Sequence, residues 1–157
     1  HATTAMCLRW LERLVSPQMR VYDVGCGSGI LAIAASKLGA GEIIAMDYDP
    51  VAVTVADENI RANNVGNVIA IQSDLLAVCE GAEPAELITA NIIADIIIRL
   101  FDQLDAHLAR GGVLLASGII DDRIADVERA AAEHGYTVLD MTCEKEWAAM
   151  IIRRSAD

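Results

Sequence analysis

The sequence predicts an α/β fold in which helices cover both faces of a doubly wound, mostly parallel sheet. Short apolar runs alternate with stretches whose apolar residues recur at helical spacing, which is typical of such sheets. The composition is 54% hydrophobic but only 4% aromatic, which indicates an aliphatic core. The last two apolar runs, 136–143 and 147–153, are too close for a crossover helix. We therefore expect an antiparallel hairpin there, with one reversed strand at the end of the sheet.

The individual elements follow from apolar runs and from capping residues. The expected strands cover residues 21–24, 42–46, 68–72, 87–90 and 113–116. Ser16-Pro17 stops the first helix, Asp49-Pro50 starts the third, and Gly39 and Gly135 follow the second and the last. These helices cover residues 4–15, 29–38, 50–63, 92–108 and 121–134. The length suits a single domain, which we assign to residues 1–157.

The charge balance limits the partners. Twelve lysines and arginines face 23 acidic residues, so the chain has a net charge of −11 and lacks the basic footprint of a nucleic-acid-binding protein. No uninterrupted apolar stretch reaches the ~18 residues of a membrane span. We therefore expect neither nucleic acid nor a membrane as partner, whereas an acidic domain can attract a basic protein.

The four cysteines and three histidines follow no metal-binding spacing. No CxxC or CxxH pair occurs, so the sequence predicts no metal site. The cysteine spacing implies no disulfide framework either, which favours a reducing, cytoplasmic location.

The loop at residues 23–30, which follows the first strand, is the first candidate for a ligand site. In an open α/β sheet, ligands bind beyond the carboxyl ends of the strands, where the strand order reverses. Gly25, Gly27 and Gly29 permit a tight turn and a close approach of the backbone to a ligand. The alternative for Gly27 and Gly29 is that they serve the packing of helix on strand.

Two residues of this loop argue against a dinucleotide. The dinucleotide fingerprint needs a glycine at the position of Ile30. Asp23 brings a carboxylate to the helix N-terminus, which disfavours a pyrophosphate but favours a ligand with an ammonium group. S-adenosylmethionine has an ammonium group and no phosphate. We therefore predict it as the cofactor, held by Asp23 and the glycines, with Cys26 as a small spacer in the loop.

Three residues at the ends of the next strands extend this site. Asp47 closes the second strand, where its carboxylate can accept hydrogen bonds from a ribose diol. Tyr48 is expected to lie against the adenine, and Asp74 to accept a hydrogen bond from the adenine amino group. Asp47 can also be a solvated turn residue, and Asp74 a helix cap. Their position at consecutive strand ends favours the cofactor interpretation.

Several segments resemble the PrmA family of methyltransferases. They read VYDVGCGSGILAIAASKLGA, MDYDPVAV, ANIIADII and EWAAMIIRR, and residues 1–4, HATT, resemble the HxTT segment of the family. The resemblance spans nearly the whole chain. It implies a Rossmann-like class I methyltransferase that uses S-adenosylmethionine, releases S-adenosylhomocysteine, and methylates amino groups of ribosomal protein eleven of the large subunit. The family grips this basic protein through a separate N-terminal domain, which we expect to be absent from this chain.

Asn91 is the predicted catalytic residue, and it also belongs to the predicted cofactor site. An amine nucleophile must be neutral and aligned with the methyl group. The Asn side-chain carbonyl can accept an N–H bond and aim the lone pair without a charge that would keep the amine protonated. Ile92-Ile93-Ala94 offers no aromatic platform for a planar substrate, which favours an aliphatic amine. The alternative is that Asn91 only caps the helix that follows.

Thr3 and Thr4 have two interpretations that the sequence leaves open. Either hydroxyl can bind the methionine carboxylate or the substrate, or one of them can cap the first helix. Other functions also stay open. They are methylation of another protein or of a small-molecule amine on the same fold, a nicotinamide-dependent oxidoreductase, and a non-catalytic nucleoside-binding module.

Overall fold

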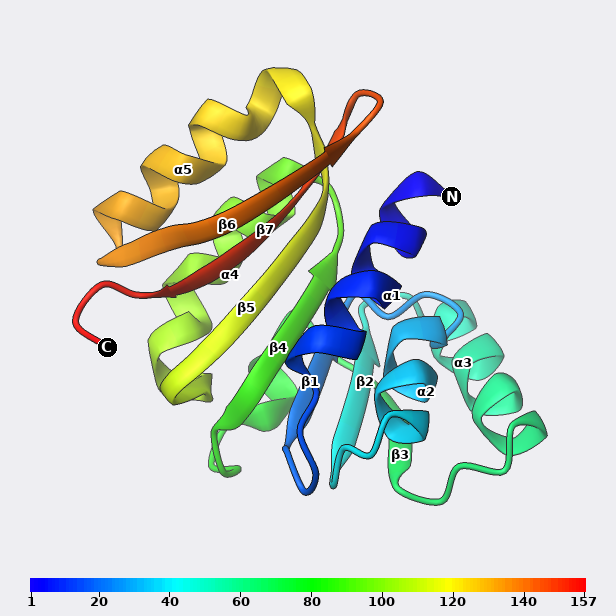
Figure 1. Cartoon of the computed structure of the whole chain (residues 1–157). Helices are drawn as coiled ribbons and strands as arrows, with labels where there is room; N and C mark the ends of the chain where they lie inside the picture. Colours follow the sequence, from blue (N-terminus) through cyan, green and yellow to red (C-terminus); the bar gives the residue numbers. More distant parts are fainter.

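The computed structural model describes residues 1–157 and contains one seven-stranded sheet with helices on both sides (Figure 1). The helices are α1 (Ala2–Leu14), α2 (Ile30–Lys37), α3 (Pro50–Ala62), α4 (Ala94–His107) and α5 (Ile124–Glu133), with short 3-10 turns η1 (Ala77–Cys79) and η2 (Asp121–Arg123). The strands are β1 (Val21–Val24), β2 (Ile43–Asp47), β3 (Val68–Gln72), β4 (Ala85–Asn91), β5 (Leu108–Ile120), β6 (Tyr136–Glu144) and β7 (Trp147–Arg154).

The strand order β3-β2-β1-β4-β5-β7-β6 confirms the doubly wound sheet and its C-terminal hairpin. Strands β1 to β5 are parallel, and β7 is antiparallel to both of its neighbours. The hairpin contains one reversed strand, as predicted, but this strand, β7, is inserted between β5 and β6 and does not form the edge of the sheet. The reason is polarity: the central residues of β7, Ala148–Ile152, are all buried, whereas five of the nine residues of β6 are exposed, so β6 forms the edge.

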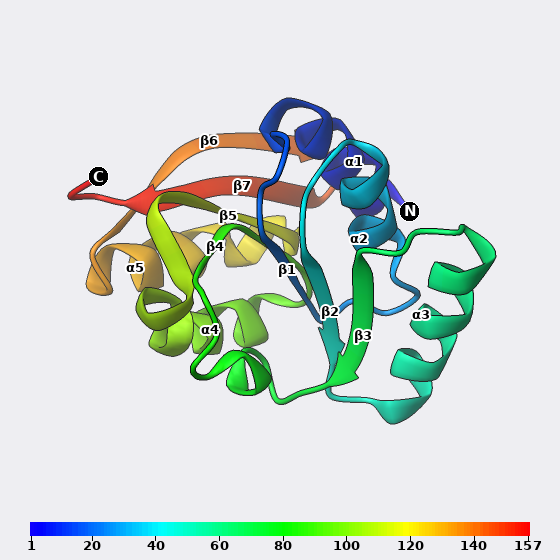
Figure 2. The ribbon, with the colours of Figure 1, turned by 90° about the horizontal axis from the view of Figure 1, so that it is seen from below.

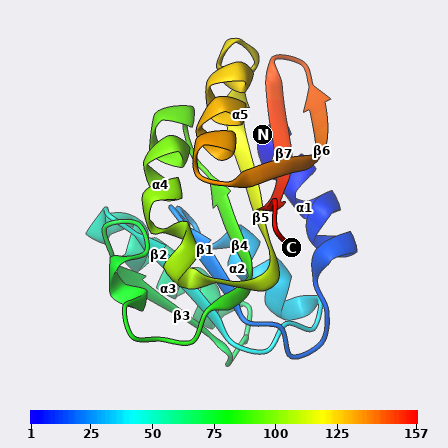
Figure 3. The same ribbon diagram turned by 90° about the vertical axis from the view of Figure 1, so that its left-hand side faces the viewer.

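Two aliphatic cores lie on the two faces of the sheet. Helices α1, α2 and α3 cover one face, and α4 and α5 cover the other, as Figure 2 and Figure 3 show. β1 and β2 are buried on both faces, which is why their sequences read as continuous apolar runs. None of the helices combines the length and the hydrophobicity needed to cross a bilayer.

Two boundaries differ from the sequence prediction in ways that affect the site. α4 begins at Ala94 with Ile93 as its N-cap, rather than near Ile92, so two residues, Ile92 and Ile93, separate the end of β4 from the helix proper. α4 also leads directly into β5, because Leu108 is already extended and pairs with Ala85. β5 is therefore longer than the predicted 113–116, and its glycine pair Gly111-Gly112 lies inside the strand.

Candidate active site

The switch in strand order lies at β1, which has β2 on one side and β4 on the other. The chain winds outward to β3 and then returns to β4 and continues to β5 in the other direction. The register places Val24 level with Met46 and with Ala90. The residues that follow these three, Gly25, Asp47 and Asn91, therefore meet at one edge of the sheet, where ligands bind in folds of this class.

Close packing around Ile92 fixes the backbone at this edge. Gly25 has φ +67°, and a Cβ there would lie 2.4 Å from Cγ2 of Ile92. Gly118 of β5 has φ +81°, and a Cβ there would lie 2.7 Å from the carbonyl oxygen of Ile92 and 3.1 Å from Oδ1 of Asn91. The segment after β4 is thus held between two glycines that no other residue can replace without strain. Sequence reasoning identified Gly25 but missed Gly118.

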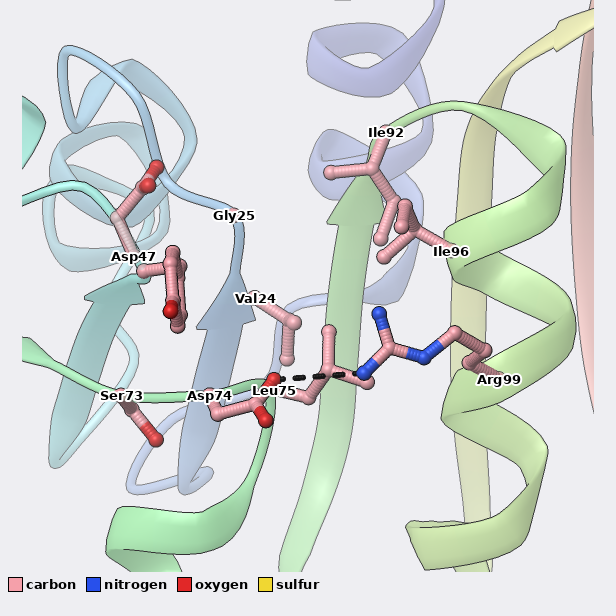
Figure 4. A pocket seen from close by; sticks show the side chains of 10 residues that line it. Val24, Gly25, Asp47, Ser73, Asp74, Leu75, Ile92, Ile96 and Arg99 are labelled. Atoms are coloured by element: carbon pink, nitrogen blue, oxygen red, sulfur yellow. Dashed lines mark ion pairs between the residues drawn. The ribbon is translucent and has the colours of Figure 1, made fainter.

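Two cavities open on either side of Gly25, which lines both of them. The larger, about 470 Å³, is lined by Asp47, Tyr48 and Asp74 together with Val24, Ser73, Leu75, Ile92, Ile96 and Arg99 (Figure 4). The smaller, about 190 Å³, is lined by Asp23, Cys26, Gly27 and Asn91 together with Thr4, Ser28, Ile30 and Leu31. The structure therefore brings most of the predicted site residues together around one loop.

Asp47 is held in place by the glycine loop and by its own turn. Its Oδ2 accepts a hydrogen bond from the Gly27 N–H at 3.0 Å, and its Oδ1 accepts one from the Asp49 N–H at 3.0 Å. These bonds fix a carboxylate at the mouth of the larger cavity, because the two donors come from different segments. Asp47 therefore acts in its own turn and also binds the glycine loop.

The far wall of the larger cavity contains an ion pair that the sequence did not reveal. Arg99 of α4 lies 3.6 Å from Oδ1 of Asp74, and both side chains are more than half exposed (Figure 4). Asp74 caps no helix, since η1 has Leu76 as its N-cap and no side-chain cap. Tyr48 is 73% exposed and lies free at the rim. In the sequence, Arg99 stands out only as a charged residue within the apolar run from Leu87 to Phe101.

Asp23 is buried below the glycine loop and only half satisfied. Its Oδ1 accepts a hydrogen bond from the Thr89 hydroxyl at 2.7 Å, whereas its Oδ2 is buried without a partner. Burial raises the pKa of Asp23 from 3.8 to about 7, and the charge of Asp47 adds to this rise. The Thr89 hydroxyl and the Ala32 N–H oppose it. Within the chain, no donor or cation compensates Oδ2 of Asp23.

Asn91 lies beside this carboxylate in the smaller cavity. Its side chain makes no hydrogen bond within the chain and caps no helix, because α4 begins three residues later. The alternative that Asn91 acts only as a cap is therefore wrong. Its amide is free to bind a ligand. Thr4 lines the same cavity.

Three further predicted site residues, Thr3, Gly29 and Cys26, make contacts that serve the fold itself. Thr3 is buried, and its hydroxyl lies 3.0 Å from Nδ1 of His1, which caps α1 in place of either threonine. Gly29 lies outside both cavities, and a Cβ there would lie 3.3 Å from that of Ala56 in α3, which supports the packing interpretation for this glycine. Burial raises the pKa of the Cys26 thiol to about 12, so this group stays neutral.

Comparison with known proteins gives a consistent family assignment. Residues 1–155 match the family model described as Ribosomal protein L11 methyltransferase (PrmA). A ribosomal protein L11 methyltransferase of Caldanaerobacter subterraneus is 49% identical over 98% of this chain, and one of Heliobacterium modesticaldum is 46% identical over 99%. The chain spans about half of these relatives, 49% of each. A crystal structure of the ribosomal protein L11 methylase of Lactobacillus delbrueckii superimposes with a TM-score of 0.92 at 37% identity, over 98% of this chain and 79% of that one.

Replacing Asp23 by Asn is expected to remove a pH-dependent loss of stability. Because the pKa of Asp23 is about 7 in the native protein, the native state keeps a proton that the unfolded chain loses above about pH 4. The contribution of Asp23 to stability is therefore full below about pH 4 and is lost as the pH rises to about 7. Urea unfolding of the unliganded chain should show Asp23→Asn gaining roughly 4 kcal/mol more at about pH 8 than at about pH 4.

The matched control is Asp49→Asn, at the exposed N-cap of α3, where Asn is an equally good cap. This variant should follow the wild-type pH dependence. Parallel stability curves for Asp23→Asn and the wild type would contradict the account of a buried, half-satisfied carboxylate.

Proposed function

The chain belongs to the PrmA family of ribosomal protein L11 methyltransferases, and on this premise we propose that it binds S-adenosylmethionine and transfers its methyl group to amino groups of a ribosomal protein. The observation that carries the proposal is the unpartnered Oδ2 of Asp23 beside a cavity that also contains the unbonded amide of Asn91. A buried carboxylate of this kind suits a ligand with an ammonium group and disfavours a diphosphate.

The residues of the two cavities fit this cofactor. Asp23 and Thr4 would hold the amino acid end in the smaller cavity, with the loop of Gly25, Cys26 and Gly27 against it. Asp47 presents an oriented carboxylate for the ribose hydroxyls. The larger cavity offers apolar walls for the adenine, from Leu75, Ile92 and Ile96, with Tyr48 at the rim and Asp74 as an acceptor for the amino group.

S-adenosylmethionine supplies a methyl carbon that its sulfonium already activates, so the protein has to align an amine and exclude water. Asn91 lies next to Gly25, where the two cavities meet. Its Oδ1 would accept an N–H bond from the neutral amine and direct the nitrogen lone pair. Because the Asn amide is uncharged, it does not stabilise the protonated, unreactive form of the amine.

Residues 1–157 would then supply the cofactor site and the catalytic centre. The part of the longer relatives that lies outside this chain would bind the substrate protein. We expect the reaction to take place in the cytoplasm. The net charge of −11 suits a basic ribosomal protein as partner. The absence of a basic surface stripe in the sequence disfavours nucleic acid in that role.

Calorimetry separates the proposed cofactor from a dinucleotide. The wild-type chain should bind S-adenosylmethionine and S-adenosylhomocysteine but not NAD. Asp47→Ala should weaken both affinities by roughly 10- to 100-fold, because it removes charge-assisted hydrogen bonds and the anchor of the Gly27 N–H. Asp57→Ala, on the exposed side of α3, serves as the control and should change neither affinity. Binding of NAD alone would overturn the proposal.

Asn91→Ala should separate turnover from cofactor affinity. In a full-length protein of the family that contains this chain, we expect methylation of ribosomal protein L11 to slow by roughly 10- to 100-fold, because the amine loses its alignment. The affinity for S-adenosylhomocysteine should stay within about twofold of the wild type, or about 0.4 kcal/mol. Asn63→Ala, at the end of α3, is the matched control. An unchanged rate in Asn91→Ala would exclude the catalytic role.

A further inference from the structure

A third cavity, of about 350 Å³, opens at the opposite edge of the sheet from Asn91 and Asp47. It lies where α1 ends and where β4 and β5 begin. Three arginines line it: Arg13 in the last turn of α1, Arg110 near the start of β5, and Arg153 near the end of β7. Along β5 this region is separated from the methyl-transfer site, because Asn91 pairs with Ser117 and the cavity is lined by residues 110–113.

These three arginines are the ones that the chain leaves unpaired. Every other arginine lies within 4.0 Å of a carboxylate oxygen, from Arg9 with Glu144 to Arg154 with Asp105. Arg13, Arg110 and Arg153 form no ion pair and no side-chain hydrogen bond, although the chain has 23 acidic residues. Like charges gathered in one cavity repel one another, so an anion between them would remove an unfavourable interaction.

Two of the arginines are partly enclosed by the protein without a charged partner. Arg153 is partly buried, and its Nε is shielded from solvent without a hydrogen-bond partner. The guanidinium carbon of Arg13 lies 4.5 Å from the centre of the Trp10 ring, within the range of a cation–π contact. Positioned guanidinium groups offer forked donors that match the oxygen atoms of phosphates and carboxylates.

The rest of the lining is compatible with a small anion. Leu14, Met19 and Val113 form the apolar part of the lining. The single carboxylate that lines the cavity, Glu86, is engaged through Oε1 with the Arg20 N–H at 3.1 Å. A second carboxylate, Asp157, lies beside the cavity, where its Oδ2 accepts a hydrogen bond from the Gly111 N–H at 2.8 Å and lies 3.7 Å from Arg154, which compensates its charge.

We propose that this cavity binds a small oxyanion, a ligand whose recognised group is a phosphate or a carboxylate. The volume is near the lower limit of ligand pockets, which suits a compact molecule rather than a nucleotide. The excess of negative charge over the whole chain opposes non-specific anion binding. Saturable binding of an anion would therefore identify a built site. The proposal does not depend on methyl transfer.

The test is a backbone NMR titration of the whole chain at constant ionic strength with inorganic phosphate and, separately, with succinate. Sodium chloride is the reference for ionic strength. Saturable shifts are expected for the amide signals of residues 110–113 and Leu14, while those of Gly27 and Asn91 stay in place. A response to phosphate alone, or to succinate alone, assigns the class of the ligand, and either supports the proposal.

Variants distinguish a site from general charge attraction. Arg110→Gln, at an exposed position that should not disturb folding, and Arg153→Gln should each weaken binding by about tenfold. Lys37→Gln removes a cation that is also unpaired, at the end of α2, and should leave the affinity within about twofold. The absence of saturable shifts with both anions, or equal weakening in Lys37→Gln and Arg110→Gln, would overturn the proposal.

Discussion

A carboxylate buried below a glycine loop is the constraint on which the site depends. Asp23 lies on β1 between β2 and β4, almost inaccessible to solvent, and only Thr89 of the neighbouring strand satisfies it directly. Burying an ionised group without a partner is unfavourable, so the free protein shifts the pKa of this residue upward rather than keeping the charge. A cationic group in the adjoining cavity would reverse that preference. The group without a partner, Oδ2 of Asp23, thus belongs to a residue that lines the smaller cavity.

The surrounding backbone keeps this carboxylate beside the reacting group. Gly25 and Gly118 allow Ile92 to pack between β1 and β5, and this packing sets the position of Asn91. Asp47 ties the glycine loop to the end of β2 through the Gly27 N–H. The cavities on the two sides of Gly25 are therefore parts of one arrangement. In the proposed function, the same few residues would bind the cofactor and align the amine.

Features of the fold that depend on local chemistry and on the spacing of apolar residues could be predicted from the sequence. The parallel strands, the hairpin and the loop of residues 23–30 follow from apolar runs, short connections and glycines. The order of the last two strands did not follow, because it depends on which hairpin strand buries more apolar surface against β5. Arg99 and Gly118 were missed because their roles arise from contacts between α4, β4 and β5 that no single segment shows.

The most direct measurement is the titration of the Asp23 carboxyl carbon by NMR, in the free chain and with S-adenosylmethionine bound. In the free chain the carboxyl should titrate at a pH of about 7. Once the ligand's ammonium group compensates the carboxylate, the midpoint should fall well below that value. A midpoint near the ordinary value of about 4 in the free chain, or one that the ligand leaves unchanged, would contradict the account.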